Sequence, residues 1–300
     1  TKNEVDADTV RRFVLAEDTE QFLCDSVDFE MNVLKRTASL NNLSDDFIAH
    51  FSANEYITNM GGYFWDMEEN IIDVLPSVIS EDEDTWFRDV VDRVFFIGSK
   101  ANFDTDDNVL TIKGVQKIPI ADAEIFTNDA PVVVREGGYM DSLRNVGITT
   151  QHNDSLYYSL YNGNIKIHTA EDYRGNADID YIADNGKKTA IHLDRIIVDN
   201  PGDEVYVTQS EGGAGSEDNP MTLYSAINYY GDAFFRANEP FLTFDGYDQP
   251  VRKCDTSSFV RFRAPIDPAQ VRIPVGEKPK NPSGRITKTG FYSTRPEFYS

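Results

Sequence analysis

The 300 residues carry 51 acidic and 28 basic side chains, a net charge of −23 that disfavours general electrostatic binding to nucleic-acid phosphates and to anionic membrane surfaces. Hydrophobic residues make up 40% of the chain, with 19 Phe and 15 Tyr, so an intrinsically disordered protein is excluded and a substantial core is expected. No apolar run reaches the roughly 18 residues of a membrane span. The only two cysteines, Cys24 and Cys254, exclude a disulfide framework and a zinc knuckle.

Residues 1–102 predict a small helical domain. Asp8 and Ser26 are candidate helix N-caps, because each precedes apolar residues at helical spacing. Further short helices are predicted from Ser44, from Trp65 to Leu75 and from Asp84 to Ile97. The apolar residues that suggest the first two helices are Val10, Phe13, Val14, Val27, Met31, Leu34 and Ala38.

From about residue 103 the apolar period changes from 3.6 to 2, which indicates strands. The connections are too short for helical crossovers, so an antiparallel sandwich or curled sheet is expected. Residues 220–237 are the exception, because Pro220 suits the first turn of a helix and apolar residues follow at helical spacing. This helix is predicted to cover the sheet. The predicted strands are 109–113, 131–135, 177–182, 189–193, 196–198, 204–208, 241–244 and 259–263.

Residues 156–169 predict a β-hairpin within this region. Two β-prone runs flank Asn162 and Gly163, which both tolerate the positive φ that a type I′ turn requires. A two-residue loop would place Leu160 opposite Ile165. One face of the hairpin would then be apolar and would need a core.

The last 37 residues, 264–300, differ in kind from the rest. They hold six of the 13 prolines, and six basic against three acidic residues, without apolar periodicity. Such a segment favours extended structure, yet four aromatic residues near its end are unusual for a disordered tail. We expect an extended, Pro-rich, aromatic-tipped arm that docks on an acidic body, either its own or a neighbour's.

These segments together predict an α+β fold in three parts. A helical domain (1–102) precedes an antiparallel β-sandwich-like domain (103–263) with one covering helix, and the arm (264–300) follows.

No stretch carries a strong catalytic, cofactor or metal signature, so we predict no catalytic, cofactor-binding or metal-binding residues. Asp178 and Asp180 share one face of a predicted strand, where two carboxylates could serve a glycosidase, but a solvated sheet face is the simpler interpretation. Residues 104–108 are rich in oxygen ligands but lack the glycine and distal Glu of an EF-hand loop, which favours a plain acidic turn. The histidines lack the spacing of a helical zinc site: His50, His152, His168 and His192.

Residues 157–167 and 172–182 resemble a pattern in virion proteins of tailed bacteriophages. The pattern is a Tyr-rich strand, an Asn-Gly turn, a second strand, a polar link and a strand such as Asp178-Ile179-Asp180-Tyr181-Ile182. It occurs in head-to-tail connector and neck proteins. The plan of a helical part, a β part and an aromatic-tipped arm also resembles ring-forming virion components. Small connectors of this class are often shorter and have longer helices, so connector, neck, tail, baseplate and capsid-associated positions all stay open.

The resemblance implies a non-enzymatic structural component of a phage virion, such as a head-to-tail adaptor, neck or tail protein, assembled in the host cytoplasm. Its partners would be other copies of itself, in a ring, and other virion proteins. No cofactor, membrane or specific nucleic acid is implied. An alternative is a carbohydrate-binding or carbohydrate-cleaving β-protein in which Tyr157, Tyr161 and Tyr181 stack on sugars; a calcium-dependent adhesion module is a third. The predicted subunit contacts are Arg285, Lys288, Phe291, Tyr292, Arg295, Phe298 and Tyr299.

Overall fold

The structure is a computed structural model, and it describes residues 4–17, 19–44, 47–76, 84–152, 156–200, 206–251, 259–270, 272–274 and 276–287. The protein is all-β, with two antiparallel sheets. These described residues contain no α-helix, only two short 3-10 segments, η1 (Ser52–Asn54) and η2 (Glu136–Gly138). The predicted α+β fold class, with its helical domain and covering helix, is therefore wrong.

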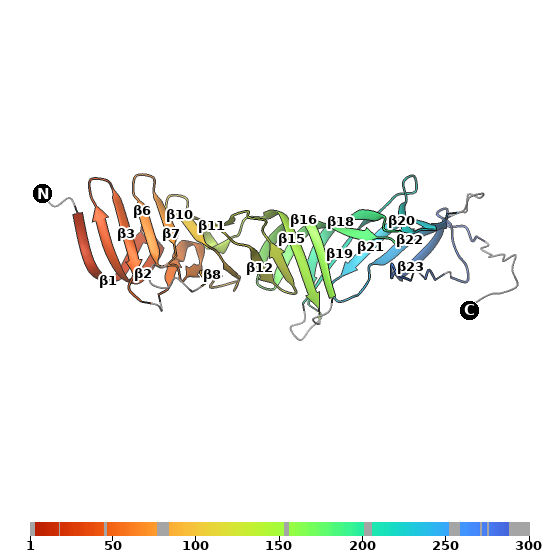
Figure 1. The fold of residues 1–300 in the computed structure, drawn as a ribbon, viewed down its shortest axis with the longest axis horizontal. Helices are drawn as coiled ribbons and strands as arrows, with labels where there is room; N and C mark the ends of the chain where they lie inside the picture. Colours follow the sequence, from red (N-terminus) through yellow and green to blue (C-terminus); the bar gives the residue numbers. More distant parts are fainter. Residues whose placement is uncertain are drawn as a thin grey trace. The chain divides into compact units, whose positions relative to one another are not determined.

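The first sheet contains twelve strands. In Figure 1, β1 lies at one end of the sheet, with β2, β3, β6 and β7 beyond it. Their order is β14-β11-β10-β7-β6-β3-β2-β4-β5-β8-β9, and β1 pairs with β2 outside this path. The strands are β1 (Glu4–Ala16), β2 (Glu20–Asn32), β3 (Thr37–Asn42), β4 (Ala49–Phe51), β5 (Tyr56–Thr58), β6 (Gly62–Asp66), β7 (Ile71–Leu75), β8 (Trp86–Asp89), β9 (Phe95–Ile97), β10 (Lys100–Asp104), β11 (Val109–Lys113) and β14 (Val132–Val134).

The second sheet contains eleven strands in the order β12-β13-β15-β16-β17-β18-β19-β21-β22-β23, with β20 paired to β21. Most neighbours in the sheet are neighbours in sequence, as in a meander. The strands are β12 (Lys117–Ile120), β13 (Ala123–Phe126), β15 (Leu143–His152), β16 (Leu156–Thr169), β17 (Asp172–Ile182), β18 (Lys188–Asp199), β19 (Val207–Ala214), β20 (Met221–Tyr224), β21 (Ile227–Arg236), β22 (Thr243–Pro250) and β23 (Val260–Pro265).

The chain divides into two compact units. One comprises Thr1–Ala177 and Ile196–Thr208, and the other comprises Asp178–Arg195 and Gln209–Ser300. The whole first sheet belongs to the first unit, and β20, β21, β22 and β23 belong to the second. The predicted boundaries after residues 102 and 263 stay predictions.

The first two predicted helices are the strands β1 and β2. Irregularities in these strands place their apolar residues at intervals that resemble helical spacing. The pairing of β1 with β2 shifts by one residue between Ala7 and Val10, which inserts an extra residue into β1. In β2, Ser26 has a φ of 57°, and buried Cys24 and Val27 lie three residues apart on either side of it. Leu34, which the helical pattern placed in a core, is 73% exposed in the turn between β2 and β3.

Residues 220–237 form β20, a turn and β21 in place of the predicted covering helix. Tyr229, Ala233 and Phe235 are buried at period 2, and Gly231 lies in phase with them. Gly231 has a φ of 146°, a conformation that favours glycine and is far from helical. The apolar residues of this segment thus fit the helical period of 3.6 as well as the strand period of 2. The segment is a strand because β21 pairs with β22 over eight residue pairs.

Residues 156–169 form one continuous strand, β16, so the predicted hairpin is also wrong. Asn162 has the positive φ that was expected, 54°, but it lies at a bulge where β16 pairs with β15. A Cβ on Gly163 would come within 2.8 Å of Val146 Cγ2. The Asn-Gly pair therefore forms a bulge at which β16 passes close to β15. It does not reverse the direction of the chain.

A close approach of two strands makes Gly212 of β19 indispensable in the second unit. A Cβ at this position would lie 1.8 Å from the carbonyl oxygen of His192 on β18, whereas a Cβ on Gly213 meets no atom within 4 Å. We expect Gly212→Ala to lower the free energy of unfolding by about 1–3 kcal/mol, because the strands must separate to admit the methyl group. Urea unfolding of Gly212→Ala beside Gly213→Ala measures this, and equal stability of the two variants would contradict it.

Candidate functional site

The solvent-facing side of the first sheet is acidic at β1 and β2. Asp6 pairs with Glu30, Glu30 pairs with Ser39, and Ser39 pairs with Phe64, so one row of side chains crosses β1, β2, β3 and β6. Glu4 begins the adjacent row two residues away. Side chains at every second position share a face, so both rows project from the same side of the sheet.

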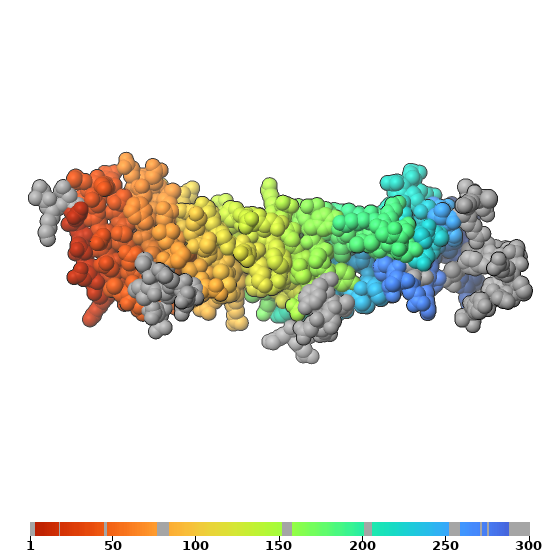
Figure 2. Space-filling view, viewed as in Figure 1, coloured from red at the N-terminus to blue at the C-terminus, as the bar shows by residue number. Residues whose placement is uncertain are grey.

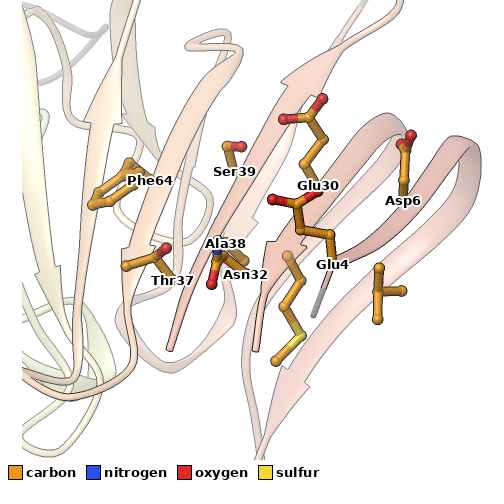
Figure 3. A pocket seen from close by; sticks show the side chains of 10 residues that line it. Glu4, Asp6, Glu30, Asn32, Thr37, Ala38, Ser39 and Phe64 are labelled. Carbon is orange, nitrogen blue, oxygen red and sulfur yellow. The ribbon is translucent and has the colours of Figure 1, made fainter. Parts of the chain in front are cut away.

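These two rows enclose a hollow of about 300 Å³. Figure 3 shows Phe64 at one side of it and Asp6 at the other, with Ser39 and Glu30 between them. The Phe64 side chain is 42% exposed, so part of its ring is available to a ligand. The hollow is lined by Glu4, Val5, Asp6, Glu30, Met31, Asn32, Thr37, Ala38, Ser39 and Phe64.

A cluster of carboxylates adjoins the hollow. Oxygen atoms of Asp6, Asp8 and Asp28 lie within 4.8 Å of one another. The bulge between Ala7 and Val10 of β1 lies at Asp8 and allows its carboxylate to approach those of Asp6 and Asp28. Carboxylate oxygens at this spacing suit a hard divalent cation, and they equally attract an ammonium or guanidinium group. We call the five carboxylates Glu4, Asp6, Asp8, Asp28 and Glu30 the acidic patch.

The acidic patch is electrostatically uncompensated. Within the described chain no basic side chain pairs with any of its five members. Arg12, the nearest cation in sequence with an ion pair, binds Asp25 at 2.8 Å, and this hydrogen bond lowers the pKa of Asp25. Among the described residues, the carboxylates of the patch are therefore open to an external partner.

The opposite charge gathers at the C-terminal end of the chain. Residues 251–300 hold ten basic and four acidic residues, a net charge of +6, whereas residues 1–250 carry −29. Among the described residues, the exposed cations of this stretch without an acidic partner are Arg272, Lys278, Lys280 and Arg285.

The described part of the predicted arm packs on its own unit through turns. Ile266 is 1% exposed, and the backbone N–H of Arg261 on β23 donates to the carbonyl of Lys280 at 3.0 Å. Lys280 and Ile286 form a β-bridge, and Arg285 lies in the exposed turn between them. The other predicted contact residues lie outside the described residues: Lys288, Phe291, Tyr292, Arg295, Phe298 and Tyr299.

The carboxylates considered for glycosidase chemistry each have a side-chain partner. Asp178 accepts from His192 Nδ1 at 2.6 Å, and Asp180 pairs with Lys188 at 2.5 Å. Both carboxylates are thus engaged by basic side chains of the neighbouring strand β18, as expected for a solvated sheet face. His168 lies on β16, separated from β18 by β17, so it does not join His192.

The candidate calcium ligand Asp104 and the candidate sugar-binding residue Tyr181 both make hydrogen bonds within the fold. Asp104 Oδ1 accepts from the backbone N–H groups of Asp106 and Asp107 at 3.0 and 3.1 Å, as in the plain acidic turn that was predicted. The buried hydroxyl of Tyr181 donates to the carbonyl of Leu223 at 2.8 Å, so this ring is a core element and offers no face to a sugar.

Comparisons of the chain with protein-family models, with curated proteins and with solved structures give no match. In the part of the chain that the structure describes, no helix is long and apolar enough to cross a membrane.

Proposed function

We propose that the protein is a non-enzymatic structural subunit that assembles by repeated contacts between copies, with the acidic patch of one copy binding the basic C-terminal stretch of the next. Following the resemblance of residues 157–182, the assembly would be a tailed-phage virion. The subunit would act there as a head-to-tail adaptor, neck or tail component, with other virion proteins as further partners.

The segregation of charge carries this proposal. The described residues of one chain include a patch of five carboxylates without a basic partner and four exposed cations without an acidic partner. Complementary patches of this kind set the orientation of an encounter and exclude wrong partners.

The hollow suits a lysine or arginine side chain. A cation that enters it would meet Glu30 and Asp6 on one side and the exposed ring of Phe64 on the other, so ion pairing and a cation–π contact would act together. Each such exposed contact contributes only about 0.5–1 kcal/mol. Stable assembly would therefore need several contacts per subunit and would weaken with added salt.

Neutralising the C-terminal cations tests the proposal. The triple variant Lys278→Gln, Lys280→Gln, Arg285→Gln is expected to weaken association about 5–150-fold, since three exposed ion pairs contribute about 1–3 kcal/mol together. The measurement is the sedimentation-velocity distribution over a range of concentrations at low salt.

The matched control removes the same charge from exposed lysines elsewhere: Lys100→Gln, Lys113→Gln, Lys166→Gln. The control is expected to associate like the unaltered chain. A full chain that stays monomeric at low salt at every concentration, alone and with candidate virion partners, would overturn the proposal. Equal weakening in both triple variants would also overturn it.

A further inference from the structure

Strand β1 is a long edge strand with an open side. It has 13 residues and pairs only with β2, so in the described part of the chain its other edge carries unpaired backbone N–H and C=O groups. Figure 2 shows the N-terminal strands (red) at the surface of the first unit. Such an edge is a template for another strand, and natural proteins usually shorten or cover it.

The inner side of β1 is incompletely covered. Val5 is 49% exposed, and Val10, Phe13 and Leu15 are only half-buried. On β3, two strands further inward, the corresponding side chains are enclosed: Ala38 is 2% exposed and Leu40 is 0% exposed. A further strand beside β1 would bury this apolar row while it satisfied the backbone groups.

The charge pattern of β1 identifies the strand that fits. Its first half carries Glu4, Asp6 and Asp8, and its second half carries Arg11 and Arg12. A parallel in-register copy would place like charges side by side, whereas an antiparallel copy places the acidic half beside the basic half.

We propose that two copies of this protein pair β1 with β1 in antiparallel orientation, with Val10 on the two-fold axis. In this register Asp8 of each copy faces Arg12 of the other. The inner side matches as well, because Val5 faces Leu15 and small Ala7 faces large Phe13. The contact is isologous, so each pairing occurs twice. This interface shares Asp8 with the acidic patch, but its backbone pairing and its apolar row do not depend on the contact of that patch with the C-terminal stretch.

A charge swap tests the pairing in the full chain. The acidic variant is Arg12→Glu with Asp25→Lys, which keeps the ion pair within the chain in reversed form. The basic variant is Asp8→Lys. Each variant alone is expected to dimerise at least about tenfold more weakly than the unaltered protein, because two facing pairs become repulsive, and an equal mixture is expected to restore the dimer. Normal dimers from either variant alone, or no recovery on mixing, would overturn the pairing.

A cysteine on the two-fold axis gives a second measurement. In a Cys254→Ser background, Val10→Cys is expected to form a disulfide-linked dimer, since facing Cα atoms in an antiparallel pair are about 4.5–5.5 Å apart. Val14→Cys is the control, because two copies of position 14 would be about 26 Å apart. Equal cross-linking at both positions, or none at position 10, would overturn the pairing. Only Asp8→Lys alters the acidic patch, and none of these variants changes Glu30, Phe64 or the four exposed cations of the C-terminal stretch. Failure of the pairing is therefore distinguishable from failure of the proposed function.

Discussion

Replacing Phe22 with alanine is expected to lower the free energy of unfolding by about 3–5 kcal/mol. Phe22 on β2 is 0% exposed, and its ring lies 5.2 Å from that of Phe51 and 5.0 Å from that of Tyr63. It joins β2, β4 and β6 on the buried side of the first sheet, where the rigid ladder of strands leaves a cavity that cannot collapse. Urea unfolding followed by far-ultraviolet circular dichroism measures the loss.

The control for Phe22→Ala is Phe95→Ala on β9, whose side chain is 42% exposed and contacts Trp86. We expect Phe95→Ala to lower the free energy of unfolding much less than Phe22→Ala, because the Phe95 ring is already partly exposed to solvent. If both substitutions changed stability equally, the aromatic cluster around Phe22 would not be the centre of the first unit.

The stability of the second unit is expected to fall by about 3 kcal/mol as the pH rises from about 4 to about 6, because Asp248 must ionise inside it. Asp248 on β22 is 8% exposed, and its Oδ1 atom has no hydrogen-bond partner among the described residues. Burial raises the pKa of Asp248 to about 6. A folded-state pKa above that of the unfolded chain means that the folded state binds the proton more tightly. The stabilisation is therefore complete below the unfolded pKa and is lost as the pH passes the folded pKa.

The substitution Asp248→Asn is expected to remove most of this dependence and to stabilise the protein at neutral pH, because the amide stays uncharged. The measurement is the urea midpoint from pH 4 to pH 7, with Asp232→Asn on the exposed side of β21 as the control. An unchanged pH dependence in Asp248→Asn would contradict this account of the buried carboxyl group.

Some of the strands after residue 103 were predictable from local pattern, whereas β12, β13 and β15 were not predicted. The predicted strand 109–113 coincides with β11, and 259–263 overlaps β23, because apolar residues alternate there without a bulge. In β1 a bulge and in β2 the left-handed residue Ser26 shift the phase of that alternation, and the apolar residues then match a helical period. In β21 the alternation is unbroken, and the apolar residues fit both periods. Gly231 in the middle of the predicted helix was the signal against it.

The candidate site was only partly predictable. The acidity of the chain and the basic character of its last residues are visible in the sequence, and both entered the predicted contact of the arm with an acidic body. The acidic patch itself depends on strand register, which brings Asp6 beside Glu30 from 24 positions away. The open edge of β1 likewise depends on strand order, which no local pattern specifies.

The most direct test of the central claim is cross-linking with a carbodiimide, which joins a carboxylate to a lysine without a spacer. Isotopically heavy and light copies of the full chain are mixed at low salt, cross-linked and digested, and peptides that combine both labels are identified by mass spectrometry. Mixed-label links are expected from Glu4, Asp6 or Glu30 to Lys278, Lys280 or Lys288, and they are expected to disappear at high salt. If every peptide linked to these lysines carried a single label, the contact would lie within one copy, and the proposed assembly would be contradicted. The absence of any link from the acidic patch would contradict it too.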